Sequence, residues 1–281
     1  MLRSQKGQAL LVVVLVMVVA LTVGLSVASR SITNLKTSQD QASSQKALSA
    51  AEAGVERVLA NPGLNPPANT AIGNTNYRIN YTTNVSQVSG TGMFLFNGGM
   101  AIGENQYVYI WPSANSGTDL YGKTPPWSNG QITLYWGTDA DGCNDPALEV
   151  SILSGTDKNN TVLTRYAYDP CASRAGNNGF DSKNTDVIKQ QTTINNVRLQ
   201  YLVKLPIVSN NVYLFSISPL YVDNSYIGAS SNLALPPQGV SVISTGSVGD
   251  PTNGQVQRKV NAYESLHQIP AELFPYTIYS P

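Results

Sequence analysis

The sequence predicts an α+β protein in which a long N-terminal helix precedes a large antiparallel β-rich domain. Three observations support this fold class: an uncharged apolar run over residues 9–28, a helical apolar periodicity that continues to about residue 60, and short Val-, Ile-, Tyr- and Thr-rich segments in the remainder. Asn61-Pro62-Gly63 marks the predicted end of the helix, because Pro62 disfavours helical backbone for the residue before it.

The first half of the helix has the length and composition of a membrane span. No charged residue occurs between Gly7 and Ser29. At about 1.5 Å per residue, the apolar run Ala9–Ala28 is roughly 30 Å long, which matches the hydrocarbon thickness of a bilayer. Backbone amides in lipid must be satisfied internally, so this run is predicted to be helical.

The second half, residues 30–60, is predicted to continue the same helix with an amphipathic pattern. We expect its apolar face to pack against the chain's own β domain and residues 9–28 to pack against copies of the chain. The apolar face consists of Leu48, Ala51, Val55, Val58 and Leu59, and Ile32, Leu35 and Ala42 extend it less regularly.

Three interpretations of this N-terminus are open. A plain single-pass anchor needs only the apolar run. A cleaved secretory signal would use the small residues Ser26-Val27-Ala28, but the run is longer than the usual 7–15 residues. The third interpretation uses the continuity of the helix beyond Arg30, which neither an anchor nor a signal peptide requires.

The N-terminal motifs resemble a known family. The basic leader with Arg3 and Lys6-Gly7, the apolar helix and the stretch Ala50-Ala51-Glu52-Ala53-Gly54 are similar to type IV pilin-like proteins, and most similar to the PilX N-terminal family of pilus-assembly proteins. The resemblance covers roughly residues 1–60. It implies that residues 1–7 are a leader, that a prepilin peptidase cuts after Gly7, and that Gln8 becomes an N-methylated first residue.

One position departs from the family pattern. Most major pilins carry Glu at the fifth mature position, where it is thought to meet the free amine of a neighbouring subunit, and here that position is Val12. The resemblance therefore favours a minor or priming pilin over a bulk subunit.

The resemblance implies a structural subunit, not an enzyme. The subunit would be held in the cytoplasmic membrane before it joins an extracellular filament. Its partners would be other pilin subunits and the prepilin peptidase. A pseudopilin of a secretion or DNA-uptake machine is one alternative. Another is a surface adhesion or carbohydrate-binding module that is exported or tethered and does not polymerise.

Residues 62–281 are predicted to form one extracellular β-rich domain, with a division near residue 190 as a lesser alternative. Two hairpins are expected, one across Gly155–Asn160 and one around Gly249-Asp250-Pro251. The predicted strands are Tyr77–Tyr81, Tyr107–Trp111, Ile132–Trp136, Leu148–Leu153, Val162–Tyr168, Val197–Val203, Val212–Ile217, Val240–Thr245 and Gln255–Tyr263.

Two cysteines, Cys143 and Cys171, lie in this part of the chain. An even number of cysteines in an exported protein predicts one disulfide, and the alternative is two free buried thiols. Asp139, Asp141 and Asp145 surround Cys143 and could offer oxygen ligands to Ca²⁺. Their spacing differs from that of the helix-loop-helix calcium site, so the sequence favours a disulfide-tied turn in which Asp and Asn bond nearby amides.

The composition bounds the remaining function classes. Seventeen basic and seventeen acidic residues balance, so the basic excess typical of a nucleic-acid binder is missing. The sequence contains neither a Gly-rich phosphate loop nor a Cys/His metal cluster, and its single histidine, His267, follows the last predicted strand. We therefore expect no cofactor.

Overall fold

The computed structural model describes residues 6–60, 70–72, 79–88, 90–113, 127–139, 141–157, 159–178, 186–250 and 254–265. The chain divides into two compact units. One contains Met1–Asn84 and Ile243–Val260, and the other contains Val85–Val242 and Asn261–Pro281. The C-terminal hairpin thus contributes to the same unit as the N-terminal helix, and no boundary falls near residue 190.

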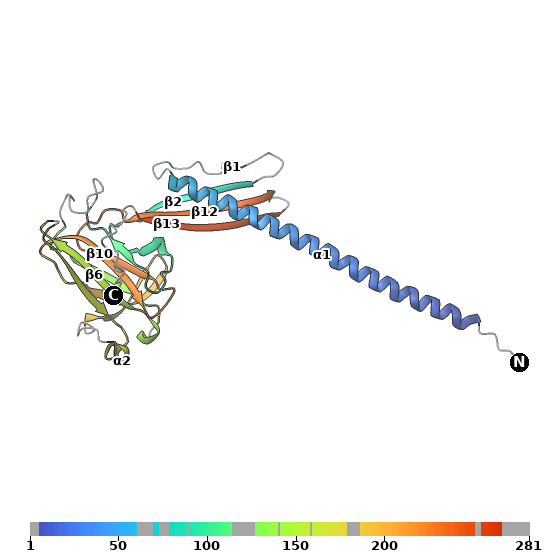
Figure 1. Ribbon diagram of the computed structural model, residues 1–281, viewed down its shortest axis with the longest axis horizontal. Coiled ribbons are helices and arrows are strands. Elements are labelled where there is room, and N and C mark those ends of the chain that lie inside the picture. The colour runs from blue at the N-terminus through green and yellow to red at the C-terminus, as the bar shows by residue number, and fades with distance from the viewer. Residues whose placement is uncertain are drawn as a thin grey trace, which may run out of the picture. The chain divides into compact units, whose positions relative to one another are not determined.

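A single helix, α1, runs without interruption over Lys6–Ala60 (Figure 1). It has 55 residues and, at about 1.5 Å per residue, is roughly 80 Å long. Its end agrees with the stop predicted at Asn61-Pro62-Gly63. Together with the antiparallel sheets that follow, it confirms the α+β fold class.

The C-terminal part of α1 packs on a four-stranded sheet with the order β1-β2-β12-β13. Small residues allow the two elements to approach closely. A Cβ added at Gly246 in β12 would overlap the backbone of Ala47, and one added at Gly54 in α1 would overlap the hydroxyl of Ser244. The Arg57 guanidinium also donates to the Tyr81 hydroxyl at 3.1 Å. The strands are β1 (Thr70–Ile72), β2 (Ile79–Val88), β12 (Gly239–Asp250) and β13 (Gly254–Ser265).

The face of α1 that is buried differs in part from the predicted one. Ala51, Val55 and Val58 are buried as expected. Leu48, Ile32 and Leu35 are not, since they are 40%, 67% and 63% exposed. The close approach at Gly246 leaves room only for small side chains there, so the buried face near this contact consists of Ala47, Ala50, Ala51 and Gly54, and Leu48 lies outside it.

The second unit contains two further antiparallel sheets. One has the order β4-β10-β6-β7 and the other the order β3-β11-β5-β9-β8. The strands of the first are β4 (Val108–Ile110), β10 (Asn211–Leu220), β6 (Ala147–Gly155) and β7 (Thr161–Tyr168), and those of the second are β3 (Phe94–Leu95), β11 (Ile227–Ser231), β5 (Ile132–Trp136), β9 (Val197–Lys204) and β8 (Ile188–Ile194).

One hydrophobic core joins these two sheets. Alternate residues of β5, namely Ile132, Leu134 and Trp136, belong to the same buried cluster as Val150 and Ile152 of β6. Because successive side chains in a strand point to opposite faces, a shared cluster of alternate residues means that the sheets pack face to face. Aromatic rings contribute to this core, including an edge-to-face contact between Trp127 and Phe215.

Each predicted strand corresponds to an observed one, apart from Tyr77 and Arg78, which lie outside the described residues. The hairpin of β6 and β7 pairs Leu148 with Tyr168 through to Gly155 with Thr161, and β12 and β13 are neighbours, as expected. The sequence missed β1, β3, β8 and β11. β1 and β3 are very short, and β11 consists mainly of small residues. β8 is polar, lies at the edge of its sheet and has exposed Lys and Gln side chains.

The contact at Gly246 gives a direct test of helix docking. Gly246→Ala is expected to lower the free energy of unfolding by about 1–3 kcal/mol, because the added methyl meets helix backbone that cannot move aside. Thermal unfolding of the detergent-solubilised full chain would measure the loss. Gly176→Ala is the matched control, since a Cβ there has only ordinary contacts at 3.8 Å or more. Equal stability of the two variants would contradict the close contact.

Candidate assembly helix and disulfide-bonded loop

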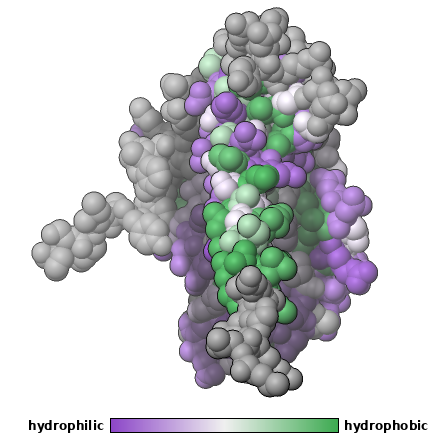
Figure 2. Space-filling model, turned by 90° about the vertical axis from the view of Figure 1, so that its right-hand side faces the viewer, coloured by the Kyte–Doolittle hydropathy of each residue, from purple (hydrophilic) through white to green (hydrophobic). Residues whose placement is uncertain are grey.

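The N-terminal half of α1 is apolar on every side. Large side chains from Leu10 to Val27 are 54–71% exposed, the range running from Val13 to Leu10. Figure 2 views the molecule from the side of this half and shows hydrophobic side chains gathered along it. Among the described residues, the part of α1 from Leu10 to Ala60 is long and apolar enough to cross a membrane, and its most apolar 18 residues are not covered by any other described part of the chain.

The hydroxyl of Thr22, within this half, is satisfied locally. The Thr22 hydroxyl donates to the Val19 carbonyl oxygen at 2.8 Å, so it presents no free donor to a lipid or protein neighbour. A Cβ at Gly24 would meet nothing within 4 Å. The surface around this glycine therefore lies open to the close approach of another helix.

The predicted processing site lies at the start of α1. Lys6, Gly7 and Gln8 belong to the first turns of the helix, and Arg3 lies outside the described residues. Val12, at the position where major pilins carry Glu, is 58% exposed among other apolar side chains. The processing of Gly7 and Gln8 remains a prediction.

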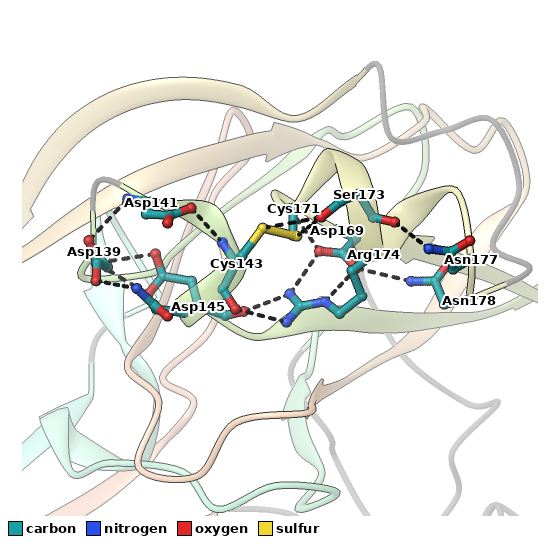
Figure 3. The surroundings of a disulfide bond; sticks show 11 residues. Asp139, Asp141, Cys143, Asp145, Asp169, Cys171, Ser173, Arg174, Asn177 and Asn178 are labelled. Carbon is teal, nitrogen blue, oxygen red and sulfur yellow. Dashed lines mark hydrogen bonds and ion pairs between the residues drawn. A yellow bond between two sulfur atoms is a disulfide. The ribbon is translucent and has the colours of Figure 1, made fainter.

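The disulfide predicted between Cys143 and Cys171 is confirmed, with the two Cα atoms 4.4 Å apart. Cys143 lies within the short helix η2 (Gly142–Asn144), and Cys171 is the residue directly before the short helix α2 (Ala172–Ala175). The bond therefore joins the loop before β6 to the loop after β7, at one end of the hairpin that these strands form (Figure 3). Together, an apolar helix and a disulfide are features of a membrane-anchored or exported protein.

Arg174 and Asp169 form a partly buried ion pair next to the disulfide (Figure 3). The Arg174 Nε and Nη2 atoms donate to the two carboxylate oxygens of Asp169, both at 2.8 Å, and Asp169 is 2% exposed. Asp169 also accepts from the Cys171 amide and the Asn178 side chain, each at 2.9 Å. This carboxylate thus orders the loop that carries Cys171.

The same guanidinium ties the two cysteine loops together. Its Nη2 donates to the Asp145 carbonyl oxygen at 2.7 Å and its Nη1 to the Cys143 carbonyl oxygen at 3.3 Å. The guanidinium also lies 4.9 Å from the ring centroid of Tyr221, whose φ of +73° is in the left-handed region.

Sequence reasoning missed Arg174 and Asp169. The available signal for Asp169 was its position two residues before Cys171, which is the spacing of an Asx turn.

The three candidate calcium ligands are already engaged with the protein's own donors. The Asp145 carboxylate accepts from the Thr138 amide at 2.7 Å and from the Asp139 amide at 3.1 Å. Asp139 accepts from the Asp141 amide and the Asn144 side chain, both at 3.0 Å, and Asp141 accepts from the Cys143 amide at 3.2 Å. These contacts build an Asx-turn loop tied by the disulfide, the arrangement the sequence favoured.

Electrostatic shifts in this region follow burial. Burial raises the pKa of Asp145 above its ordinary value, and the amides of Thr138 and Asp139 partly oppose the shift. Elsewhere in the chain, burial raises the pKa of Tyr263 in β13 to about 12. Among the described residues, no group of three or more His, Cys, Asp or Glu side chains could hold a metal ion. His267 lies outside the part of the chain that the structure describes.

Comparison with known proteins adds no family. No family model matches the chain, and no curated protein matches it. A solved structure described as "AvmM Catalyzes Macrocyclization in Alchivemycin A Biosynthesis" aligns at 11% identity over 73% of this chain and 99% of that one. Its TM-score of 0.18 is too low to support a shared fold.

Removing the Arg174 side chain tests the importance of the ion pair. Arg174→Ala is expected to lower the free energy of unfolding by about 3 kcal/mol, because it leaves the Asp169 carboxylate buried without its cation. Chemical denaturation of the oxidised protein would measure this loss. Arg165→Ala, on an exposed position of β7, should change stability by no more than about 0.5 kcal/mol. Similar values for both variants would contradict the assignment.

Proposed function

We propose that this chain is a structural subunit of a type IV pilus or a related filament. The single observation that carries the proposal is the division of α1 into two halves with different partners. Its C-terminal part is fixed on the chain's own sheet, whereas no other part of the chain that the structure describes covers the most apolar part of the half from Leu10 to Val27. Such a helix is suited to stand in lipid first and among other helices later.

The continuity of α1 argues for assembly over simple anchoring. An anchor needs about 20 apolar residues and then a linker. Here the helix continues for about 30 residues past Ala28 to Ala60, and small residues dock its end rigidly against β12. A rigid connection transmits the position of the apolar half to the folded part of each subunit, as repeated packing in a filament requires.

The apolar half can exchange lipid for protein because both environments are apolar. Transmembrane helices associate through close packing at small residues rather than through the hydrophobic effect. Ala20, Gly24 and Ser26 provide such positions. Contacts of this kind that repeat from copy to copy form a heterologous interface, which extends a filament instead of closing a ring.

The remaining elements have supporting roles under this proposal. A prepilin peptidase would cut after Gly7 and expose Gln8 for methylation, and Val12 favours a minor over a major subunit. The β sheets would lie outside the membrane, and the Cys143–Cys171 disulfide would brace those of the second unit. No catalytic role is proposed for them.

The mature N-terminus tests the proposal. Mass spectrometry of the mature protein, isolated from the membrane, the medium and sheared filaments, is expected to show a methylated Gln8 start in the filament fraction. A start at Ser29 would identify a secreted module and an intact Met1 a plain anchor, and either would contradict the pilin assignment.

Substitution at the cleavage site tests the link to assembly. Gly7→Val is expected to leave the protein in the membrane and to remove it from the filament fraction, because a β-branched side chain would block peptidase cleavage after this position. Leu2→Val, elsewhere in the leader, is the control and should assemble normally. Filaments that contain the Gly7→Val protein at the wild-type level would overturn the scheme.

A further inference from the structure

The turn between β6 and β7 presents an asparagine to solvent. Asn159 is exposed, and its backbone amide donates to the Asp157 carboxylate at 2.8 Å. The side chain of the neighbouring Asn160 donates to the same carboxylate, also at 2.8 Å. Among the described residues, the Asn159 side chain has no hydrogen-bond partner. The turn therefore fixes the backbone at Asn159 and leaves its carboxamide open to solvent.

Asn159 also begins an acceptor sequence for N-linked sugars. Asn159-Asn160-Thr161 has the pattern Asn-X-Thr, in which X is any residue except proline. In exported proteins this pattern is glycosylated on surface loops. Thr161 is the first residue of β7, where it pairs with Gly155 of β6, so the acceptor sequence spans the end of the turn.

Two other acceptor sequences occur in the chain, and both lie within β2. They are Asn80-Tyr81-Thr82 and Asn84-Val85-Ser86. β2 lies between β1 and β12 in its sheet, and Tyr81 is only 3% exposed. A transferase that binds either sequence would have to draw a strand out of its sheet. The turn at Asn159 can be bound without such a change, because connecting segments lie at the surface.

The strand that follows Asn159 has an unprotected edge. β7 forms one edge of the sheet β4-β10-β6-β7, and an edge strand presents unpaired N–H and C=O groups to which another chain can pair. Val162 and Leu163 at its start are 60% and 48% exposed. Residues 161–164 include no charge, proline or glycine, and the first charge on the strand is Arg165.

The other edge strands that the structure describes are protected. β1, β3 and β4 have only two or three residues each. β8 has an exposed Lys189 followed by an irregular register, and β13 has exposed Arg258 and Lys259. Short length, charge and irregular register are the features by which edge strands avoid pairing with other chains. The start of β7 has none of them, and a bulky polar group beside it would serve the same purpose.

We propose that Asn159 is an N-glycosylation site and that its glycan covers the uncharged start of β7. The glycan donor is an oligosaccharide attached through its anomeric carbon to a polyprenyl diphosphate. Asn159 Nδ2 forms a bond to the anomeric carbon, and the bond from that carbon to the diphosphate oxygen breaks. The polyprenyl diphosphate leaves with the electron pair, and Nδ2 releases one proton. At about 3.3 Å per strand residue, Leu163 lies within about 13 Å of Asn159, beside the first sugars.

This site goes beyond the filament function and does not depend on it, since the transfer requires only that the turn lies outside the membrane. A glycan on a chain that never enters filaments would overturn the filament function and leave the site standing. Filaments built from a chain with an unmodified Asn159 would do the reverse.

Peptide mass spectrometry of the full chain, purified in detergent from the cells that make it, tests the modification. The peptide that contains Asn159 is expected to carry a hexose-containing mass, and enzymatic removal of the glycan should convert Asn159 to Asp. Thr161→Ala is expected to abolish the added mass, whereas Thr161→Ser should keep it because the hydroxyl remains. Asn160→Gln is the matched control and should also keep it, since the pattern is intact. An unmodified Asn159, or a glycan that persists in Thr161→Ala, overturns the proposal.

Sedimentation of the same detergent-purified protein tests the covering role. Asn159→Gln is expected to raise the sedimented fraction at least about twofold on concentration, because the edge of β7 becomes free to pair. Adding Val162→Lys to that variant should restore the wild-type fraction by placing a charge on the edge, and Val162→Thr, which adds no charge, should not. Equal sedimentation of Asn159→Gln and the wild-type chain would show that the glycan does not cover the strand.

Discussion

The whole arrangement depends on an apolar surface that the chain cannot bury by itself. From Leu10 to Val27 the large apolar side chains of α1 are more than half exposed, and no other described part of the chain covers the most apolar part of the helix. In water such a surface would drive aggregation, so it needs lipid or other helices as its surroundings. In the proposed function, lipid surrounds this surface before assembly and other helices surround it in the filament.

A second constraint is the rigidity of the joint between α1 and its sheet. Gly246 and Gly54 remove side chains where helix and strand meet, and Ala47 and Ala51 fill the remaining space closely. Close packing makes this joint resistant to bending, because a shift of the helix would overlap backbone atoms. In the second unit, the disulfide, Arg174 and Asp169 play the comparable role of fixing two loops at the end of one hairpin.

Sequence reasoning predicted the elements whose cause is local. The length of the uncharged apolar run predicted the helix, and Pro62 predicted where it ends. The even number of cysteines predicted the disulfide. It failed where long-range contacts determine which residues are buried. Leu48 was predicted to be a core residue, but the close approach of β12 at Gly246 buries Ala47 and Ala51 instead. Neither the polar strand β8 nor the ion pair of Arg174 with Asp169 is marked by a periodic sequence pattern. The strand depends on pairing with β9, and the ion pair depends on contacts within and between loops.

The exchange of lipid for protein around α1 is the central claim, and a depth-resolved label measures it most directly. A nitroxide on Val18→Cys would be read by electron paramagnetic resonance in membranes and in sheared filaments, with oxygen as the lipid-soluble relaxant. The account predicts high oxygen accessibility in membranes and low accessibility in filaments. A label that stays equally accessible to oxygen in both fractions would contradict it.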